Sequence, residues 1–120
     1  MNVKTTTIDE IKQKINTFVS ERDWNKYHSA KNLSAAITGE AAELMEIFRW
    51  MNDQESTDAM YGKKAVDIRH EIADVAYMLL CLCNAYNIDL SKAMEEKMVI
   101  NAQRYPIEKA KGNTKKYTEL

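Results

Sequence analysis

The sequence predicts an all-helical fold, a four-helix bundle or part of an oligomeric one. Only three of the 120 residues are glycine and one is proline, so the turn residues that a many-stranded sheet needs are scarce. Apolar residues instead recur at helical spacing over long stretches. Short connections between these stretches are typical of antiparallel neighbours in a bundle. The length fits one domain, residues 1–120.

The first helix is expected to begin after Thr7, because Thr7 and Glu10 have the spacing of a capping box. A polar segment at 23–31 is expected to be a loop. The second helix is expected over 32–51. The apolar residues at helical spacing are Ile8, Ile11, Ile15, Phe18 and Val19 in the first helix, and Leu33, Ala36, Ile37, Ala41, Leu44 and Phe48 in the second.

A second polar loop is expected at 52–62, followed by a third helix over 64–86. Residues 75–83 of this helix are apolar almost all round. A helix of that kind must be buried on more than one side, which in so short a chain predicts a partner subunit and hence a homodimer or homotetramer.

Asp89 is expected to cap a fourth helix. This helix should end at Tyr105, because the following Pro106 disfavours helical backbone at the residue before it. The remaining segment, residues 106–120, is basic and expected to be irregular.

Charge and hydropathy argue against several classes of protein. A net charge of −1 gives no reason to expect a nucleic-acid polymer or an anionic membrane as partner. No apolar run approaches the ~20 residues of a membrane span, and residues 1–7 lack a signal-like stretch. We therefore expect a soluble, cytoplasmic protein.

Cys81 and Cys83 point to different sides of one predicted helix, which favours two buried thiols over a disulfide or a zinc site.

Two acidic pairs lie where core-facing helices should be apolar. Glu40 and Glu43 are three residues apart, as are Glu71 and Asp74, so each pair shares one helix face. If the two helices pack antiparallel, the four carboxylates converge. A hard divalent cation would remove their repulsion, and all-oxygen ligation favours Mg²⁺ or Mn²⁺. Such an ion is the usual companion of a triphosphate.

Other interpretations of these acids exist. A single E-x-x-E motif is usually a solvated helix face, but two such pairs among apolar neighbours are harder to explain in that way. A di-iron carboxylate bundle requires Glu-x-x-His pairs, and His70 directly precedes Glu71 and so points to another face. A non-catalytic helical module that binds a nucleotide or a protein without turnover remains the alternative function.

Motifs of one family run in order along nearly the whole chain. They are Glu21-Arg22-Asp23-Trp24, His28, Lys31-Asn32-Leu33, Gly39-Glu40-Ala41-Ala42-Glu43-Leu44, Phe48-Arg49-Trp50, Glu71-Ile72-Ala73-Asp74-Val75, Ile88-Asp89-Leu90, Lys97-Met98, Asn101, Arg104-Tyr105-Pro106 and Lys116-Tyr117-Thr118. On these motifs the sequence resembles the MazG-like all-α nucleoside triphosphate pyrophosphohydrolases, and among them the dCTP pyrophosphatase branch.

The resemblance implies hydrolysis of a nucleoside triphosphate to the monophosphate and pyrophosphate, in a MazG-type fold completed by oligomerisation. It implies that all four acids bind Mg²⁺, and we expect Glu43 or Glu40 to deprotonate or orient the attacking water. In the dCTP branch the residues that match Trp24, His28 and Trp50 line the base pocket, and those that match Asn101 and Tyr105 contact the substrate. We expect Lys97 to be a phosphate ligand. This chain departs from mammalian members at Ile15, where they carry His, and at Met78, where they carry Tyr.

Spacing adds two expectations about these side chains. Trp50 follows Glu43 by seven residues, so it is expected on the same face of the second helix, two turns and roughly 10 Å further along. Lys97, Asn101 and Tyr105 recur every four residues and form one polar stripe. Without a role in binding, Trp50 would be a core tryptophan at a helix end, and the polar stripe would be a solvated helix face.

Overall fold

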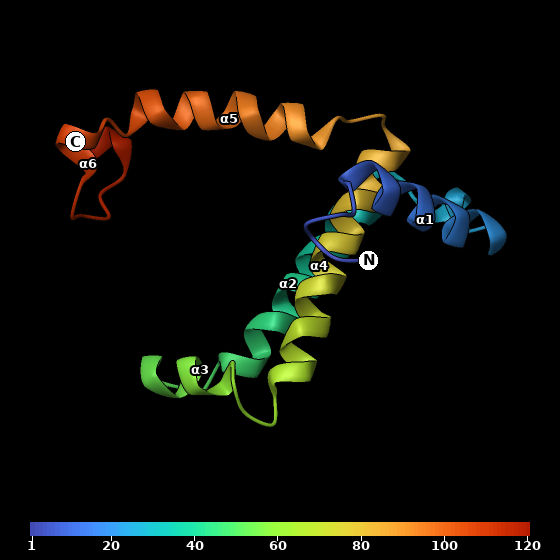
Figure 1. The fold of residues 1–120 in the computed structure, drawn as a ribbon, viewed down its shortest axis with the longest axis horizontal. Coiled ribbons are helices and arrows are strands. Elements are labelled where there is room, and N and C mark those ends of the chain that lie inside the picture. Colours follow the sequence, from blue (N-terminus) through green and yellow to red (C-terminus); the bar gives the residue numbers. More distant parts are fainter. The chain divides into compact units, whose positions relative to one another are not determined.

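The structure is a computed structural model that describes residues 1–120, and it is all-helical, as predicted (Figure 1). The chain divides into two compact units, residues 1–87 and 88–120, which are described separately below. None of the helices has the length and apolar character needed to cross a membrane. The helices are α1 (Ile8–Glu21), α2 (Ala30–Phe48), α3 (Asp53–Ala59), α4 (Ala65–Ala85), α5 (Leu90–Arg104) and α6 (Ile107–Ala110), with 3₁₀ turns at Asn25–Tyr27 and Tyr117–Glu119.

In the first unit, α2 and α4 run antiparallel and side by side (Figure 1), and α1 packs against α4. The best-buried side chains come from these three helices: Ile15, Val19, Leu33, Ile68, Leu80, Cys81 and Cys83. Both cysteines are buried free thiols, which confirms that prediction. The antiparallel pair is the feature that brings residues near 40 and near 71 to the same level.

Helix α1 begins and ends with well-defined caps. The Glu10 amide donates to Thr7 Oγ1 at 3.1 Å and the Thr7 amide donates to Glu10 Oε2 at 2.7 Å, so the predicted capping box is present. At the other end, the Trp24 and Asp23 amides donate to the carbonyls of Val19 and Ser20, both at 3.1 Å. These two bonds form a Schellman motif, in which Asp23 adopts the left-handed φ of 53° usually taken by glycine. The motif sets the direction in which the chain leaves α1 at Trp24.

The segment after Trp24 is more ordered than the predicted loop. Residues 25–27 form a 3₁₀ turn, and Ser29 caps α2, whose first residue is Ala30 rather than Asn32. The Ala30 amide also donates to the Tyr86 hydroxyl at 2.8 Å, which ties the start of α2 to the end of α4. The loop prediction missed these caps because polar composition alone does not distinguish a loop from a capped helix start.

The prediction of a loop over 52–62 is wrong for its first half, where α3 forms. Asn52 Oδ1 accepts from the Glu55 amide at 2.8 Å, and Glu55 Oε1 accepts from the Asn52 amide at 3.2 Å. This capping box starts a new helix at Asp53, so α2 ends at Phe48 and does not continue to residue 51.

The second unit consists of α5, α6 and the residues after them. Asp89 caps α5 as predicted, since its Oδ1 accepts from the Lys92 amide at 3.0 Å. Tyr105 is the C-terminal cap and Pro106 precedes α6. The tail is less irregular than predicted, because it contains α6 and a 3₁₀ turn whose Tyr117 ring meets that of Tyr105 edge to face at 6.1 Å.

Candidate metal and nucleotide site

Three carboxylates from α2 and α4 meet within the first unit. Glu40, Glu43 and Glu71 each offer a ligand oxygen, and these oxygens lie within 4.8 Å of one another. Antiparallel packing brings the chain's residue 71 level with 40 and 43, as the sequence pattern predicted. Asp74 is not part of this closest group, but its charge acts on both Glu40 and Glu71.

The carboxylates are not neutralised by protein groups. Glu40 Oε2 and Glu71 Oε2 are buried and have no hydrogen-bond partner. Burial raises the pKa of Glu40, and the charges of Glu43 and Asp74 raise it further. Burial likewise raises the pKa of Glu71, followed by the charges of Glu43 and Asp74. Glu40 and Glu71 are therefore harder to ionise than an isolated glutamate.

A hard divalent cation fits this donor set. Every available ligand atom is a carboxylate oxygen, the type that Mg²⁺ and Mn²⁺ prefer. Buried acceptors without donors are rare in folded proteins, and a cation would satisfy both orphaned oxygens at once. None of the three clustered residues is histidine or cysteine, so the set lacks the nitrogen and sulfur ligands typical of zinc.

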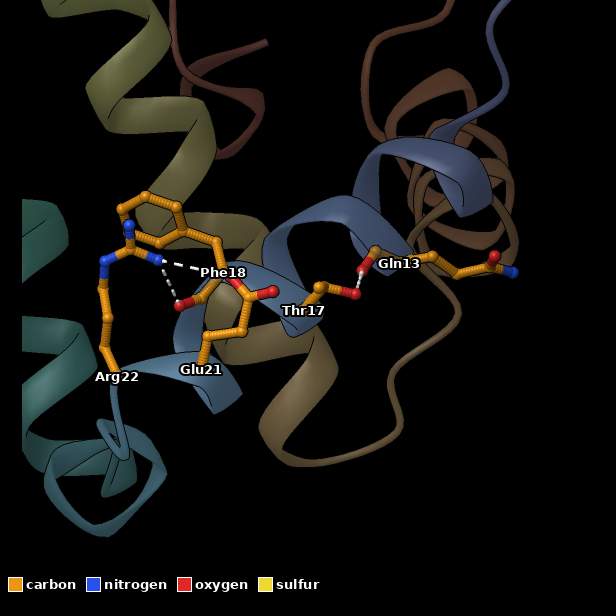
Figure 2. Close-up of polar contacts among 5 residues, drawn as sticks. All are labelled: Gln13, Thr17, Phe18, Glu21 and Arg22. Carbon is orange, nitrogen blue, oxygen red and sulfur yellow. Dashed lines mark hydrogen bonds and ion pairs between the residues drawn. The ribbon is translucent and has the colours of Figure 1, made fainter.

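Trp24 belongs to an aromatic cluster between α1 and α4. Its ring meets Phe18 edge to face, with the ring centroids 5.9 Å apart, and Phe18 in turn meets Tyr77 at 6.3 Å. Arg22 folds back over Phe18, with its guanidinium carbon 3.5 Å from the ring centroid (Figure 2). Trp24 stays 44 % exposed, so part of its surface is open for a ligand.

His28 lines a small pocket of about 40 Å³ beside α1 and α4. Several polar side chains share it, and Asn84 also donates to the Lys12 carbonyl at 3.0 Å, which links α4 to α1. The pocket is lined by both polar and apolar side chains. Its lining includes Ile15, Asn16, Asn25, His28, Cys81 and Asn84.

The helix on which the expectation for Trp50 rests is shorter than predicted. α2 ends at Phe48, so Trp50 lies in the turn that precedes the Asn52 cap, and its shared face with Glu43 stays a prediction. The Arg49 guanidinium lies over its ring, with 4.7 Å between the guanidinium carbon and the centroid. With 82 % of its surface exposed, Trp50 is not a core residue either.

The remaining predicted substrate residues, Lys97, Asn101 and Tyr105, all belong to the second unit. Lys97 and Asn101 are exposed on α5, and the Asn101 carbonyl accepts from the Tyr105 amide at 2.8 Å. Lys97 and Asn101 lie one turn apart on α5 and Tyr105 caps its end, and their contact with a substrate stays a prediction.

Sequence reasoning missed Phe18, Arg22 and Tyr77. Phe18 was expected only as part of the apolar stripe of the first helix, and Arg22 only as part of a family motif. Their signal in the sequence is weak, because ring contacts between α1 and α4 depend on helix packing. Asn84 was missed as well, although an amide directly after the apolar run 75–83 marks a possible interhelical hydrogen bond.

Comparison with known proteins gives the same family as the sequence motifs. The model of the MazG-like family matches residues 35–120. The dCTP pyrophosphatase 1 proteins of Rattus norvegicus and Homo sapiens are each 36 % identical to this chain over 115 residues, which cover 95 % of the chain and 68 % of each relative.

A solved structure agrees in fold. The crystal structure of a pyrophosphatase from Archaeoglobus fulgidus superimposes with a TM-score of 0.79 at 34 % identity, and the match covers 88 % of this chain and 98 % of that one. These findings confirm the predicted all-α MazG-like fold and the predicted enzyme class, a nucleoside triphosphate pyrophosphohydrolase. The chain belongs to the MazG-like family.

Proposed function

We propose that this protein hydrolyses nucleoside triphosphates, dCTP or a related deoxynucleoside triphosphate, to the monophosphate and pyrophosphate, with Mg²⁺ or Mn²⁺ as cofactor. The observation that carries the proposal is the meeting of Glu40, Glu43 and Glu71 with two buried, unpartnered oxygens. A cluster of this kind is poorly stable without a cation, and a cation held there would also bind the phosphate oxygens of a nucleotide. The similarity to dCTP pyrophosphatase 1 supports the choice of substrate.

The proposal gives each of the four acids a role. Glu40, Glu43, Glu71 and Asp74 would hold the metal, which when bound neutralises charge on the triphosphate and on the leaving pyrophosphate. Water attacks a phosphorus of the triphosphate chain, and the bond to the pyrophosphate oxygen breaks. Glu43 or Glu40 accepts the proton of the water or orients it.

The other predicted residues would bind the rest of the nucleotide. Trp24, half exposed at the end of α1, offers a stacking surface to the base, and His28, which lines a small pocket, offers a polar group. Trp50 provides a second exposed indole. In the second unit, Lys97, Asn101 and Tyr105 carry a cation, an amide and a phenol, groups suited to phosphate and sugar.

We further propose that the 120 residues act as one domain within a homodimer or homotetramer in the cytoplasm. A groove of about 410 Å³ between α1 and α4 is lined almost wholly by apolar side chains. Ile72 and Leu79 of α4 are also substantially exposed. Apolar surface of this kind is usually covered by another protein surface. Light scattering at micromolar concentration should give the mass of a dimer or tetramer, and a monomer mass would contradict the assembly.

The decisive experiment is a turnover screen of natural nucleotides with Mg²⁺, with products separated by chromatography. We expect a monophosphate and pyrophosphate, and loss of nearly all turnover in Glu43→Gln. The matched control is Glu46→Gln, one turn further along α2, where the carboxylate pairs with Arg49 at 3.4 Å instead of joining the cluster. Binding without turnover would favour the non-catalytic module, and full activity in chelator would refute the metal's role.

A further inference from the structure

Phe18 is the central ring of the aromatic cluster on α1. Its edge-to-face contact with Trp24 has an interplanar angle of 70°, and its contact with Tyr77 has an angle of 89°. Arg22 lies over its face. Phe18 therefore contacts three different side chains although 41 % of its own surface is exposed.

Two of these contacts fix Phe18 itself. Tyr77 lies on α4 only three residues after Asp74, so it anchors Phe18 to the helix that carries two of the acids. Arg22 is held in place by two interactions shown in Figure 2: its Nη1 donates to the Phe18 carbonyl at 3.0 Å and lies 3.7 Å from Glu21 Oε2. Phe18 is thus restrained on one side by another helix and on one face by a guanidinium.

The third contact of Phe18, with the Trp24 ring, also restrains Trp24. The Schellman motif fixes the backbone of Trp24, but the indole can still rotate about its side-chain bonds. Aromatic pairs prefer edge-to-face or offset arrangements, so a fixed Phe18 ring favours one orientation of the indole. Because Arg22 covers one face of Phe18, Trp24 is kept from stacking there.

We propose that Phe18 is a positioning residue, which orients Trp24 for stacking on the nucleobase. The inference rests on the proposed function, in which Trp24 contacts the base. Phe18 itself contacts no reacting atom. Its effect on the enzyme is therefore on substrate binding through Trp24, while the metal cluster and the chemical step are unchanged.

A purely structural role of Phe18 makes a different prediction. Loss of a packing contact would lower the fraction of folded enzyme, which reduces apparent kcat but leaves KM unchanged. Loss of an oriented indole would raise KM while kcat is kept. The split between these two constants therefore separates the two roles.

The test uses Phe18→Leu, which keeps apolar bulk and removes the ring, and Phe18→Tyr, which keeps the ring. We expect KM for the best deoxynucleotide to rise about three- to tenfold in Phe18→Leu, the size of one aromatic pair interaction, with kcat within about twofold. Phe18→Tyr should restore the wild-type KM. Ile11→Ala is the matched control, because Ile11 lines the same α1–α4 groove but has no ring that meets Trp24.

A double-mutant cycle completes the test. Adding Phe18→Leu to Trp24→Ala should cause no further rise in KM, since the residue that Phe18 orients is gone. If Trp24→Ala raises KM but Phe18→Leu alone does not, or if their effects simply add, the positioning role is refuted and the proposed function stands. If the wild-type protein turns over no nucleotide, or if Trp24→Ala leaves KM unchanged, the assignment of Trp24 fails and the inference fails with it.

Discussion

Glu40 on α2 and Glu71 on α4 each have one carboxylate oxygen, Oε2, that is buried and has no hydrogen-bond donor. The two residues are 31 positions apart in sequence, and their oxygens come within 4.8 Å only because their helices pack antiparallel. In the absence of a cation this arrangement opposes folding. The stability of the protein should therefore depend on the metal.

The first prediction is that Mg²⁺ stabilises the folded protein. A ligand that binds the folded state alone adds about 2.7 kcal/mol at a concentration one hundred times its Kd. Thermal unfolding should therefore shift upward with millimolar Mg²⁺ and return to its starting value with excess chelator. An unfolding midpoint that is the same with and without Mg²⁺ would argue against a metal bound by the cluster.

The second prediction concerns Glu71→Gln. The amide removes one negative charge and supplies donors to the neighbouring carboxylates, so the metal-free protein should become more stable, while the stabilisation by Mg²⁺ should shrink. Urea unfolding in chelator and in Mg²⁺ measures both effects. Glu46→Gln should change neither, because Glu46 is exposed and pairs with Arg49. Destabilisation of metal-free Glu71→Gln would contradict the idea of unrelieved repulsion.

The third prediction concerns Tyr77→Phe. The Tyr77 hydroxyl is buried without a hydrogen-bond partner, and burial raises its pKa, as does the neighbouring Cys81. Removing an unsatisfied buried group should leave the free energy of unfolding unchanged or raise it by up to about 1 kcal/mol. The contacts of the ring with Phe18 are kept. A loss of about 1 kcal/mol or more in urea unfolding would mean that the hydroxyl has a partner in solution.

The fourth prediction compares two glycines. Gly39 lies inside α2 with no atom within 4 Å of an added Cβ, so Gly39→Ala should stabilise the protein by about 0.5–1 kcal/mol. Gly112 has a φ of 81°, where a side chain is strained, so Gly112→Ala should destabilise the segment around it despite equally open space. Chemical unfolding checks the first, and amide exchange near residue 112 checks the second. Equal effects of the two substitutions on stability would contradict this prediction.

The fifth prediction is that Trp50→Ala raises KM roughly tenfold without lowering the unfolding temperature. Base stacking contributes about 1–3 kcal/mol, and about 1.4 kcal/mol is a factor of ten. An indole that is 82 % exposed contributes little to the core, so stability should be kept. Steady-state kinetics with several deoxynucleotides, alongside Mg²⁺ affinity as the control, tests this. Unchanged KM for every substrate would mean that the base binds elsewhere.

Local signals in the sequence determined most of the helical boundaries. The Thr7–Glu10 capping box and the Asp89 cap begin helices where the sequence predicted them, because their hydrogen bonds join near neighbours in the chain. The paired acids were recognisable for a similar reason, since a spacing of three fixes a shared helix face without any tertiary information. The Asn52–Glu55 capping box was equally local, and it was overlooked only because the surrounding polar residues resemble a loop.

Relations between helices were decided by the tertiary structure. The antiparallel packing of α2 and α4 put Glu40 beside Glu71 and left two of their oxygens unpartnered, which no spacing within one helix could reveal. The contact of α1 with α4 joined Phe18 to Tyr77 across 59 positions of sequence. Side-chain contacts of this range depend on how helices approach one another, and that approach is set by the burial of many residues together. The sequence by itself therefore determined which residues could do the chemistry, and the packing of the helices decided which of them meet.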